Sequence, residues 1–251
     1  MKTTGNTILI TGAGTGVGLE AAKQLSKNGN TIIMVARNAE RLKIEADKLR
    51  NAHAIPCDLS NFEDLTRLVA KLKENHKDLN MIFLNAGIAA NYNLFEEADA
   101  YKTSIAEMTT NYHSAVYLTQ ALESLLAEKD DAAMLITTSG VVFAPDLLHP
   151  TYSAAKAALH SYILSMRLVL ERKKSSVKVF ELMLPLVDSP FSSAVQSDLK
   201  ISPEKAVNEI VSGLEKNEFE MHIGLTKDIY EVYLKSPQQA LELVNNLTGE
   251  N

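Results

Sequence analysis

The stretch "TILITGAGTGVGLEAAKQL", residues 7–25, decides the fold, because a short apolar run ends in glycines and continues with helical periodicity. The run "NTILIT", residues 6–11, predicts the first strand, and its apolar residues do not alternate with polar ones, which is typical of a strand buried on both faces of a parallel sheet. Gly12, Gly16 and Gly18 separate this strand from the helix. Bare backbone there can approach a phosphate, and the helix N-terminus offers N–H groups. The pattern predicts a phosphate-binding turn; a glycine turn used only for close packing is the alternative.

The same alternation of strand and helix continues along the chain. Short apolar runs predict further strands at 30–35, 53–58, 79–84, 132–138, 177–184 and 219–224. Helix-period stretches occur at 17–28, 61–75, 104–128 and 203–216. We therefore predict an α/β fold of the Rossmann type, a doubly wound parallel sheet of about seven strands with helices on both faces. It forms a single domain over residues 1–251, with a substrate loop at about 186–202 and a polar C-terminal tail at about 226–251.

Composition excludes several classes of function. The 251 residues are 46% hydrophobic and 22% charged, with a formal net charge of −6, and no apolar run approaches the roughly 18 residues that span a bilayer. An acidic chain without Lys/Arg runs is a poor binder of nucleic acid or anionic membranes. The single cysteine, Cys57, excludes an internal disulfide and a cysteine metal cage, and the six histidines form no metal-ligand pattern with carboxylates. We expect a cytoplasmic protein with no metal, nucleic-acid partner or membrane partner.

The end of the second strand bears on which dinucleotide would bind. It reads "MVARNAERL", residues 34–42, with Arg37 after Ala36 and no acid at the turn. An NAD site usually places an acid there to hold the ribose hydroxyls. A guanidinium instead suits a 2′-phosphate, because it forms paired charge-assisted hydrogen bonds, and Thr15 adds a hydroxyl. The turn predicts NADP(H) in preference to NAD(H), unless Arg37 only caps a loop.

A second motif, "TYSAAKAALHSY" at residues 151–162, places Tyr152 and Lys156 on one helix face, one turn apart. A phenol with an ordinary pKa near ~10 is a poor acid–base group at neutral pH. Bringing that pKa to 7 requires about 4 kcal/mol of differential stabilisation. A nearby ammonium, together with the positive charge of an oxidised nicotinamide, acts in that direction. Taken alone, these residues also fit an amphipathic helix with a snorkelling lysine.

In this order, the motifs resemble the short-chain dehydrogenase/reductase family, in its single-domain branch, over nearly the whole chain. The resemblance is carried by the glycine spacing at 11–18, "CDLS" at 57–60, "LNAG" at 84–87, "TTNYHSA" at 109–115, "LITTSG" at 135–140 and the Tyr152/Lys156 pair. The glycine turn and the segment 219–246 are also similar to a bacterial subgroup labelled DltE-like.

The resemblance implies roles for individual residues. Tyr152 would donate a proton in reduction and accept one in oxidation, while Lys156 would hold ribose hydroxyls and lower the tyrosine's pKa. Ser139 would orient the carbonyl oxygen, and Asn111 would hold a water that extends a proton relay. The implied NADP-binding residues are Gly12, Gly14, Thr15, Gly16, Val17, Gly18, Arg37, Asn38, Asp58, Leu59, Asn85, Ala86, Gly87, Tyr152, Lys156, Pro185, Val187 and Ser189.

One segment departs from the family pattern. The family usually has Pro-Gly after the sixth strand, whereas "LPLVDSPFSS", residues 184–193, has Leu186 after Pro185. A leucine there narrows the pocket and restricts the backbone. The predicted substrate pocket is Val141, Phe143, Leu147, His149, Leu186 and Phe191. It is mainly apolar, and His149 is either a polar handle for substrate or an exposed loop histidine.

The leading functional hypothesis is an NADP(H)-dependent oxidoreductase that interconverts a carbonyl and an alcohol on a small or medium apolar molecule. The alternative is an NADP(H)-binding redox-sensing regulator without turnover, which the Leu186 departure supports and the intact Asn/Ser/Tyr/Lys set opposes. A nucleotide-sugar epimerase is disfavoured by the glycine spacing. The sequence does not define the substrate, the physiological direction or the product stereochemistry.

The resemblance also implies a homodimer or homotetramer, because family members commonly pair through two long helices. Candidate apolar residues for such a surface are Leu118, Leu122, Leu125, Leu126, Leu159, Ile163 and Leu170. Core packing within one chain explains many of these positions equally well.

Overall fold

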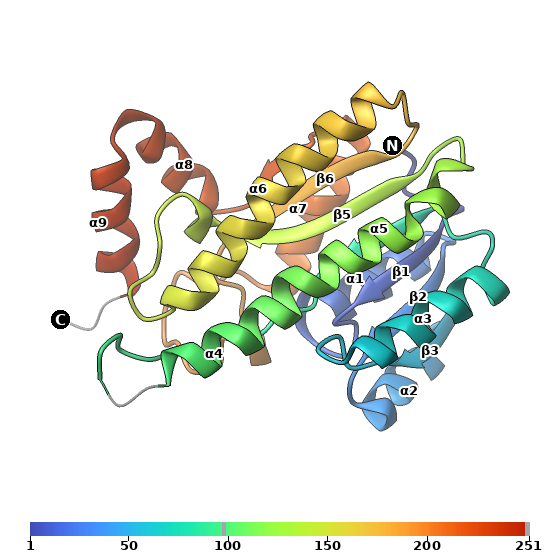
Figure 1. Ribbon diagram of the computed structural model, residues 1–251, viewed down its shortest axis with the longest axis horizontal. Coiled ribbons are helices and arrows are strands. Elements are labelled where there is room, and N and C mark those ends of the chain that lie inside the picture. The colour runs from blue at the N-terminus through green and yellow to red at the C-terminus, as the bar shows by residue number, and fades with distance from the viewer. Residues whose placement is uncertain (97–98, 249–251) are drawn as a thin grey trace.

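The computed structural model describes residues 1–96 and 99–248, and it contains a parallel sheet in the order β3-β2-β1-β4-β5-β6-β7 (Figure 1). The strands are β1 (Thr7–Thr11), β2 (Thr31–Ala36), β3 (Ala52–Pro56), β4 (Met81–Leu84), β5 (Ala133–Ser139), β6 (Lys178–Leu184) and β7 (Glu220–His222). The predicted seven-stranded Rossmann-type sheet is confirmed.

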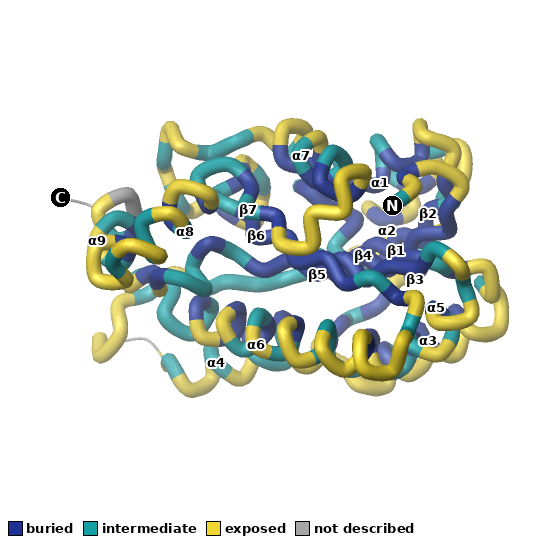
Figure 2. Tube along the Cα trace, turned by 90° about the horizontal axis from the view of Figure 1, so that it is seen from above, coloured by how far each residue is buried: buried dark blue, intermediate teal, exposed yellow. Residues whose placement is uncertain are grey.

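Helices cover both faces of this sheet (Figure 2). They are α1 (Gly16–Lys27), α2 (Ala39–Asp47), α3 (Phe62–Asn75), α4 (Ala100–Glu107), α5 (Ser114–Ala127), α6 (Pro150–Arg172), α7 (Pro203–Lys216), α8 (Thr226–Lys235) and α9 (Pro237–Thr248). The core under α1, α2 and α7 is separate from the core under α3, α5 and α6. Within the described ranges, none of these helices is both long enough and apolar enough to cross a bilayer.

The strands are apolar at successive positions because each face of the sheet has its own core. Ile8 and Ile10 of β1 pack in the cluster under α1 and α7, whereas Leu9 packs in the opposite cluster. Successive side chains of a strand point to opposite faces, so a strand covered on both sides cannot alternate apolar with polar residues. This explains the uninterrupted apolar run at residues 8–10.

Close packing of α1 against β1 requires glycine. A Cβ on Gly18 would lie 2.4 Å from the carbonyl oxygen of Gly12, a contact that no side chain tolerates. Gly12 and Gly16 themselves have left-handed backbone, with φ of +69° and +55°. The α1 N-terminus therefore lies directly beside the carboxyl end of β1.

The C-terminal segment differs from the predicted polar tail. Residues 226–248 form α8 and α9, which lie together beyond one edge of the sheet (Figure 1), and residues 249–251 lie outside the described part of the chain. Ile229 of α8 and Ala240 of α9 bury apolar side chains with Ala144, in a third small cluster. The segment contains many charged residues, but its apolar residues recur at helical spacing, so one stripe is buried while the polar residues face outward.

The surface proposed for pairing of subunits is also different from the expectation. Leu118, Leu122, Leu126, Leu159, Ile163 and Leu170 are buried inside the core of a single chain, and Leu125 packs at its margin. These residues lie on the faces of α5 and α6 that pack against the sheet. The large apolar residues of α6 that are exposed are instead Leu164, Leu168 and Val169.

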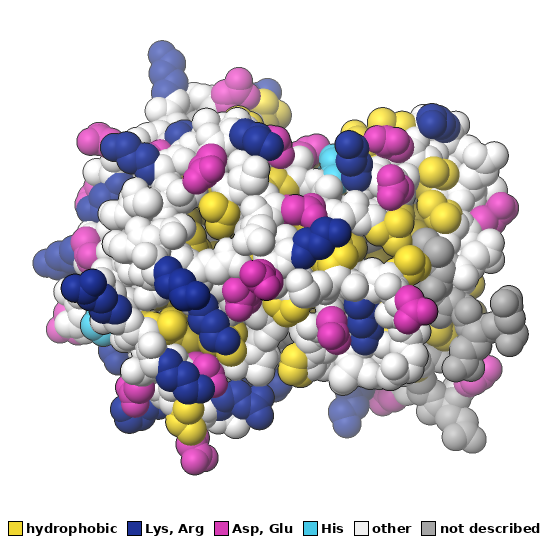
Figure 3. All heavy atoms as spheres, turned by 180° about the vertical axis from the view of Figure 1, so that it is seen from behind, with side chains coloured by type: hydrophobic (Ala, Val, Ile, Leu, Met, Phe, Trp, Pro, Cys, Tyr) yellow, Lys and Arg dark blue, Asp and Glu magenta, His cyan; other side chains and the backbone are white. Residues whose placement is uncertain are grey.

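On one face of the molecule, charged residues are distributed without segregation by sign (Figure 3). On the face turned away from the reader in Figure 1, Lys and Arg side chains alternate with Asp and Glu, and apolar side chains are visible in hollows between them (Figure 3). The excess of 31 acidic over 25 basic residues is therefore not gathered into one acidic region on this face.

Ala240→Asp tests whether α9 is part of the folded core. Ala240 is fully buried, so an aspartate there would lack hydrogen-bond partners and is expected to lower Tm by roughly 5–10 °C. The matched control is Gln239→Asp, one residue away on the exposed side of the same helix, which should leave Tm nearly unchanged. Scanning calorimetry of both variants gives the comparison; equal Tm values would mean that the segment is a tail after all.

Candidate active site

One cavity of about 1200 Å³ lies along the carboxyl ends of the central strands. Its volume exceeds the roughly 300–1,000 Å³ of a pocket for a single small molecule, so it has room for a cofactor and a substrate together. The predicted residues that line it are Gly12, Gly14, Thr15, Gly16, Val17, Arg37, Asn38, Asp58, Leu59, Asn85, Ala86, Gly87, Ser139, Val141, Leu147, His149, Tyr152, Lys156, Pro185, Leu186, Val187, Ser189 and Phe191.

Three predicted residues do not line the cavity. Gly18 lies in the first turn of α1, where the absence of a side chain permits α1 to pack closely against the backbone of Gly12. Asn111 is buried in the wall. Phe143, predicted to contact substrate, packs instead against α8, with ring centroids 4.8 Å from Tyr230 and 5.4 Å from Tyr233. Phe143 follows the short 3₁₀ turn at Gly140–Val142, and its ring packs on the α8 side of this turn while Val141 lines the cavity, so the expectation for Phe143 was wrong.

The structure also brings in residues that the sequence analysis missed. Arg41 lines the same end of the cavity as Arg37, four residues earlier at the start of α2. The helical spacing of these two arginines was a usable signal. Asn245 of α9 lines the opposite end. No local pattern connects Asn245 with the cavity, because it is separated from the loop that it contacts by about a hundred residues of chain.

The end of the cavity next to β1 and β2 is suited to anionic groups. The glycine turn leads into the N-terminus of α1, whose first N–H groups and dipole attract anions. Asn38 caps α2 by accepting a hydrogen bond from Arg41 N, which fixes the arginine-bearing turn. Burial acts to raise the pKa of Asp58, but hydrogen bonds from Ser60 and the charge of Arg37 outweigh it and lower that pKa. These residues fit a dinucleotide carrying several phosphates.

At the other end, β5 and α6 bring three polar side chains together. Ser139 is the last residue of β5, and Tyr152 and Lys156 lie in the first two turns of α6. The Lys156 ammonium nitrogen is 5.7 Å from the centroid of the Tyr152 ring and donates a 2.8 Å hydrogen bond to Thr137 O. The structure thus brings Ser139, from one sequence motif, to the same site as Tyr152 and Lys156, which belong to another.

The pKa values in the protein alone differ from the expectation for Tyr152. Burial raises the pKa of its phenol, hydrogen bonding with Ser139 acts in the opposite direction, and the negative charge of Glu107 raises it further. Burial also lowers the pKa of the Lys156 ammonium to about 8, although the charge of Glu181 acts against this. The predicted lowering of the tyrosine pKa is therefore not a property of the protein without its ligands; Tyr152 is held as the protonated phenol.

A π-helical segment, Met108–His113, interrupts the long predicted helix and carries Asn111. Such segments occur mostly as local insertions in α-helices, frequently at functional sites. The Asn111 amide donates to Ile88 O and accepts from Ile88 N, both at 2.8 Å. A Cβ on Gly87 would lie 3.2 Å from Asn111 Oδ1 and 3.8 Å from Lys156 Nζ. The bare backbone at Gly87 thus lets Asn111 and Lys156 approach the same point.

Leu186 occupies its unusual position without backbone strain. It is not among the residues with positive φ, so the backbone there does not require glycine. Its carbonyl accepts a 3.1 Å hydrogen bond from Ile201 N, and the next residue forms a parallel bridge with Ile201. The loop after β6 is therefore held against the segment before α7, and the Leu186 side chain lines the cavity.

The comparisons with known proteins agree with this architecture. The sequence model of the short chain dehydrogenase family matches residues 6–200. The chain is 32% identical to the "Uncharacterized oxidoreductase DltE" of Bacillus subtilis (strain 168), over 88% of this chain and 89% of that protein.

Two solved structures share the fold at lower identity. A short chain dehydrogenase from Burkholderia cenocepacia J2315, in complex with NADP, superposes with a TM-score of 0.86 and 22% identity over 97% of this chain and 99% of that one. A short chain dehydrogenase/reductase from Burkholderia phymatum, in complex with NAD, gives a TM-score of 0.85 and 17% identity over 100% and 99% of the two chains.

The pKa of Lys156 leads to a prediction about stability. Because the folded pKa, about 8, lies below the unfolded value of 10.5, the unfolded chain binds more protons between these pH values, and stability rises with pH in this window. Relative to Lys156→Met, the wild-type protein is expected to gain roughly 3 kcal/mol in unfolding free energy between pH 7 and pH 10.5.

Urea unfolding of both proteins without ligand, at several pH values, measures this difference. The control is Lys71→Met, which removes a lysine from the exposed surface of α3 and should show no such trend. A constant difference between wild type and Lys156→Met across the window would show that the ammonium is not buried.

Proposed function

The chain belongs to the short-chain dehydrogenase family, and on that premise we propose that it is an NADP(H)-dependent oxidoreductase that interconverts a carbonyl and an alcohol. The observation that carries the proposal is the convergence of Ser139, Tyr152 and Lys156 in the same cavity as the glycine turn. When bound, the nicotinamide cofactor would exchange a hydride with the substrate carbon. The side chains of this protein would position the substrate and move the proton.

Tyr152 is the proposed general acid in reduction. Because burial and the charge of Glu107 keep the phenol protonated, it is ready to give its proton to a carbonyl oxygen. The Ser139 hydroxyl would donate a hydrogen bond to the same oxygen and fix its position. In oxidation the phenolate would accept the proton, and the Lys156 ammonium would stabilise that phenolate.

In this proposal Asn111 positions the backbone of Ile88 and takes part in proton supply. Both polar atoms of its amide hold the backbone of Ile88. Each carbonyl oxygen has two lone pairs, so Asn111 Oδ1 can also accept from a water near Gly87, the point that Lys156 Nζ approaches. Such a water would connect Lys156 with solvent and return a proton to Tyr152.

The preference for NADP(H) over NAD(H) rests on the two arginines. Arg37 and Arg41 line the cavity beyond the end of β2, at the position where NAD-specific sites of this fold carry an acid. Guanidinium groups bind a phosphate through two parallel charge-assisted hydrogen bonds. One of the two similar folds was solved with NADP and the other with NAD, so the fold alone does not select between them.

The substrate end of the cavity supports an apolar molecule. Leu147, Phe191 and Leu199 line the cavity and keep 66%, 49% and 45% of their surface exposed, which makes the mouth of the cavity apolar. The Tyr152 ring contacts Phe191 at a centroid distance of 5.8 Å, so this apolar wall extends to the proposed acid. A ketone or aldehyde with small or medium apolar substituents fits this lining.

Arg37→Ala and Arg41→Ala test the choice of cofactor. Loss of a charge-assisted pair to the 2′-phosphate is expected to raise the Kd for NADPH about 10- to 100-fold and the Kd for NADH less than about threefold. Arg50→Ala, which removes an exposed arginine outside the cavity, is the control and should change neither constant. Fluorescence titration gives both constants, and equal losses for the two cofactors would contradict the 2′-phosphate assignment.

Tyr152→Phe tests the acid. The variant is expected to bind NADPH within about threefold of the wild-type affinity and to lose at least about 100-fold in turnover, the scale of general acid catalysis. NADPH absorbance, with NADH alongside, is followed across a panel of ketones and aldehydes. Retained turnover in Tyr152→Phe would mean that another group is the acid. If the wild-type protein binds NADPH but reduces no member of the panel, the redox-sensing regulator becomes the better proposal.

A further inference from the structure

The loop between β5 and α6 contains a histidine–aspartate pair in the wall of the cavity. His149 Nδ1 lies 2.8 Å from Asp146 Oδ2, and the two side chains are 16% and 9% exposed. Both residues line the cavity, and His149 comes immediately before α6, three residues ahead of Tyr152. The pair is therefore part of the substrate end of the site.

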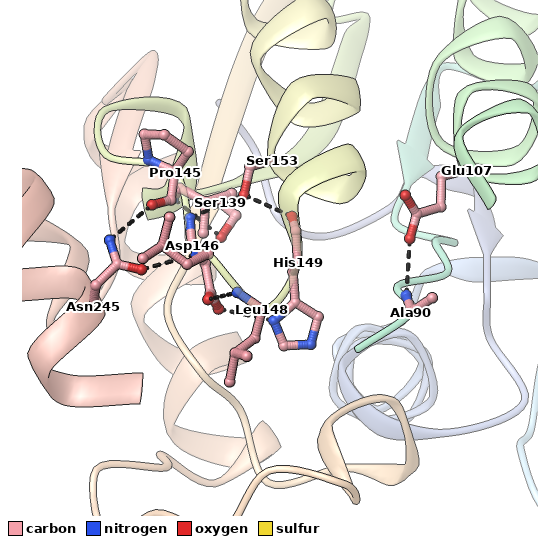
Figure 4. A network of polar contacts seen from close by, with 11 residues as sticks. Ala90, Glu107, Ser139, Pro145, Asp146, Leu148, His149, Ser153 and Asn245 are labelled. Carbon is pink, nitrogen blue, oxygen red and sulfur yellow. Dashed lines mark hydrogen bonds and ion pairs between the residues drawn. The ribbon is translucent and has the colours of Figure 1, made fainter. Parts of the chain in front are cut away.

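Asp146 is fixed by hydrogen bonds to both of its carboxylate oxygens (Figure 4). Oδ1 accepts from Leu148 N at 2.9 Å, which leaves Oδ2 for the imidazole. Its backbone N–H donates to Ser153 Oγ at 3.1 Å, and the Ser153 hydroxyl donates to His149 O. The first turn of α6 thus determines the position of both members of the pair.

The loop is anchored from two other directions as well. Asn245 of α9 accepts from Leu147 N at 2.8 Å and donates to Pro145 O at 3.0 Å, so it holds two residues of the loop (Figure 4). Tyr92 N donates to Leu148 O at 3.0 Å from the loop after β4. An imidazole carried by a loop with this many contacts is pre-organised for binding.

The aspartate determines which nitrogen of the neutral imidazole carries the proton. A carboxylate only accepts hydrogen bonds, so in the neutral form of His149 the hydrogen is on Nδ1 and Nε2 presents its lone pair. Within the described residues, Nε2 has no hydrogen-bond partner. The ring projects from the loop on the side away from Asn245 (Figure 4). Leu147, Leu148 and Phe191 line the same cavity, together with polar side chains such as Asn91 and Gln196.

We propose that His149 is a specificity-determining residue whose Nε2 accepts a hydrogen bond from a hydroxyl group of the substrate, with Asp146 as the positioning residue. The inference rests on the proposed function and narrows its substrate class to a hydroxy ketone or hydroxy aldehyde, with a diol as the reduced product. A small number of fixed polar groups among apolar side chains is the usual way in which such a site determines the orientation of its ligand.

Four matched ketones test this assignment: 2-pentanone and its 1-hydroxy, 4-hydroxy and 5-hydroxy derivatives. At least one hydroxy ketone is expected to exceed 2-pentanone about tenfold or more in kcat/KM with NADPH. In His149→Phe and in the closer substitute His149→Gln, this ratio should fall at least about fivefold. His53→Phe removes an exposed histidine that does not line the cavity and is the control, so it should keep the wild-type ratio.

Two kinetic outcomes would overturn the inference while the proposed function stands. One is reduction of 2-pentanone together with a hydroxyl preference that survives in His149→Phe. The other is a His149-dependent preference for 2-oxopentanoate over every hydroxy ketone, because this would assign Nε2 to a carboxylate as a charged donor. Failure of the proposed function looks different: the wild-type protein would bind NADPH and reduce none of these ketones.

The role of Asp146 has a readout that does not depend on turnover. Nitrogen-15 spectra of the histidine side chains in the NADP⁺-loaded protein should show, among the rings protonated at Nδ1, one whose signal disappears in His149→Gln and is therefore assigned to His149; His160, whose Nδ1 faces Glu181, gives a signal that stays. In Asp146→Asn the His149 ring is expected to change its tautomer, and the preference for the hydroxy ketone should fall through KM. A His149 ring protonated at Nε2 in the wild-type protein would overturn the inference directly.

Discussion

Parallel pairing of β1 with β2 on one side and with β4 on the other is the constraint on which the rest of this structure depends. Parallel strands end at the same edge of a sheet, and the change of strand order beside β1 opens a crevice at that edge. The contact between Gly12 and Gly18 then brings the N-terminus of α1 to the same place. The glycine turn, Arg37 and Ser139 meet in one cavity because each follows or ends a strand of this sheet.

Ionisable groups are buried beside this crevice. In the protein alone, their burial makes an unfavourable electrostatic contribution to the free energy of folding. Lys156 is 3% exposed, and its ammonium has only the Thr137 carbonyl as a hydrogen-bond acceptor within the described residues. Glu107 is buried with Oε1 bonded to Ala90 N and Oε2 without a partner in the same part of the chain. Perturbed pKa values and unsatisfied groups of this kind concentrate at functional sites, where ligands complete the interactions.

Sequence-based prediction was accurate for features that are determined within one helix or strand. It was less accurate for features that depend on contacts between elements. Tyr152 and Lys156 were predictable as a pair because a helix determines which residues share a face. Arg41 could have been found by the same reasoning from Arg37. Phe143 was assigned wrongly because a short 3₁₀ turn, which no residue pattern marked, directs it toward α8. The C-terminal helices were missed because their apolar stripe is short and contributes to a small cluster outside the main core.

The sequence by itself determined the class of the fold, the glycine turn and the residues that carry the proposed chemistry, since these depend on local periodicity and on spacing along one element. Only the tertiary structure decided how those residues meet. It buries Lys156 and partly buries Tyr152, which sets the direction of their pKa changes, and it places Asn245 against the loop that bears Asp146 and His149. Burial and contacts between distant segments depend on the packing of the whole chain, which no short stretch of sequence encodes.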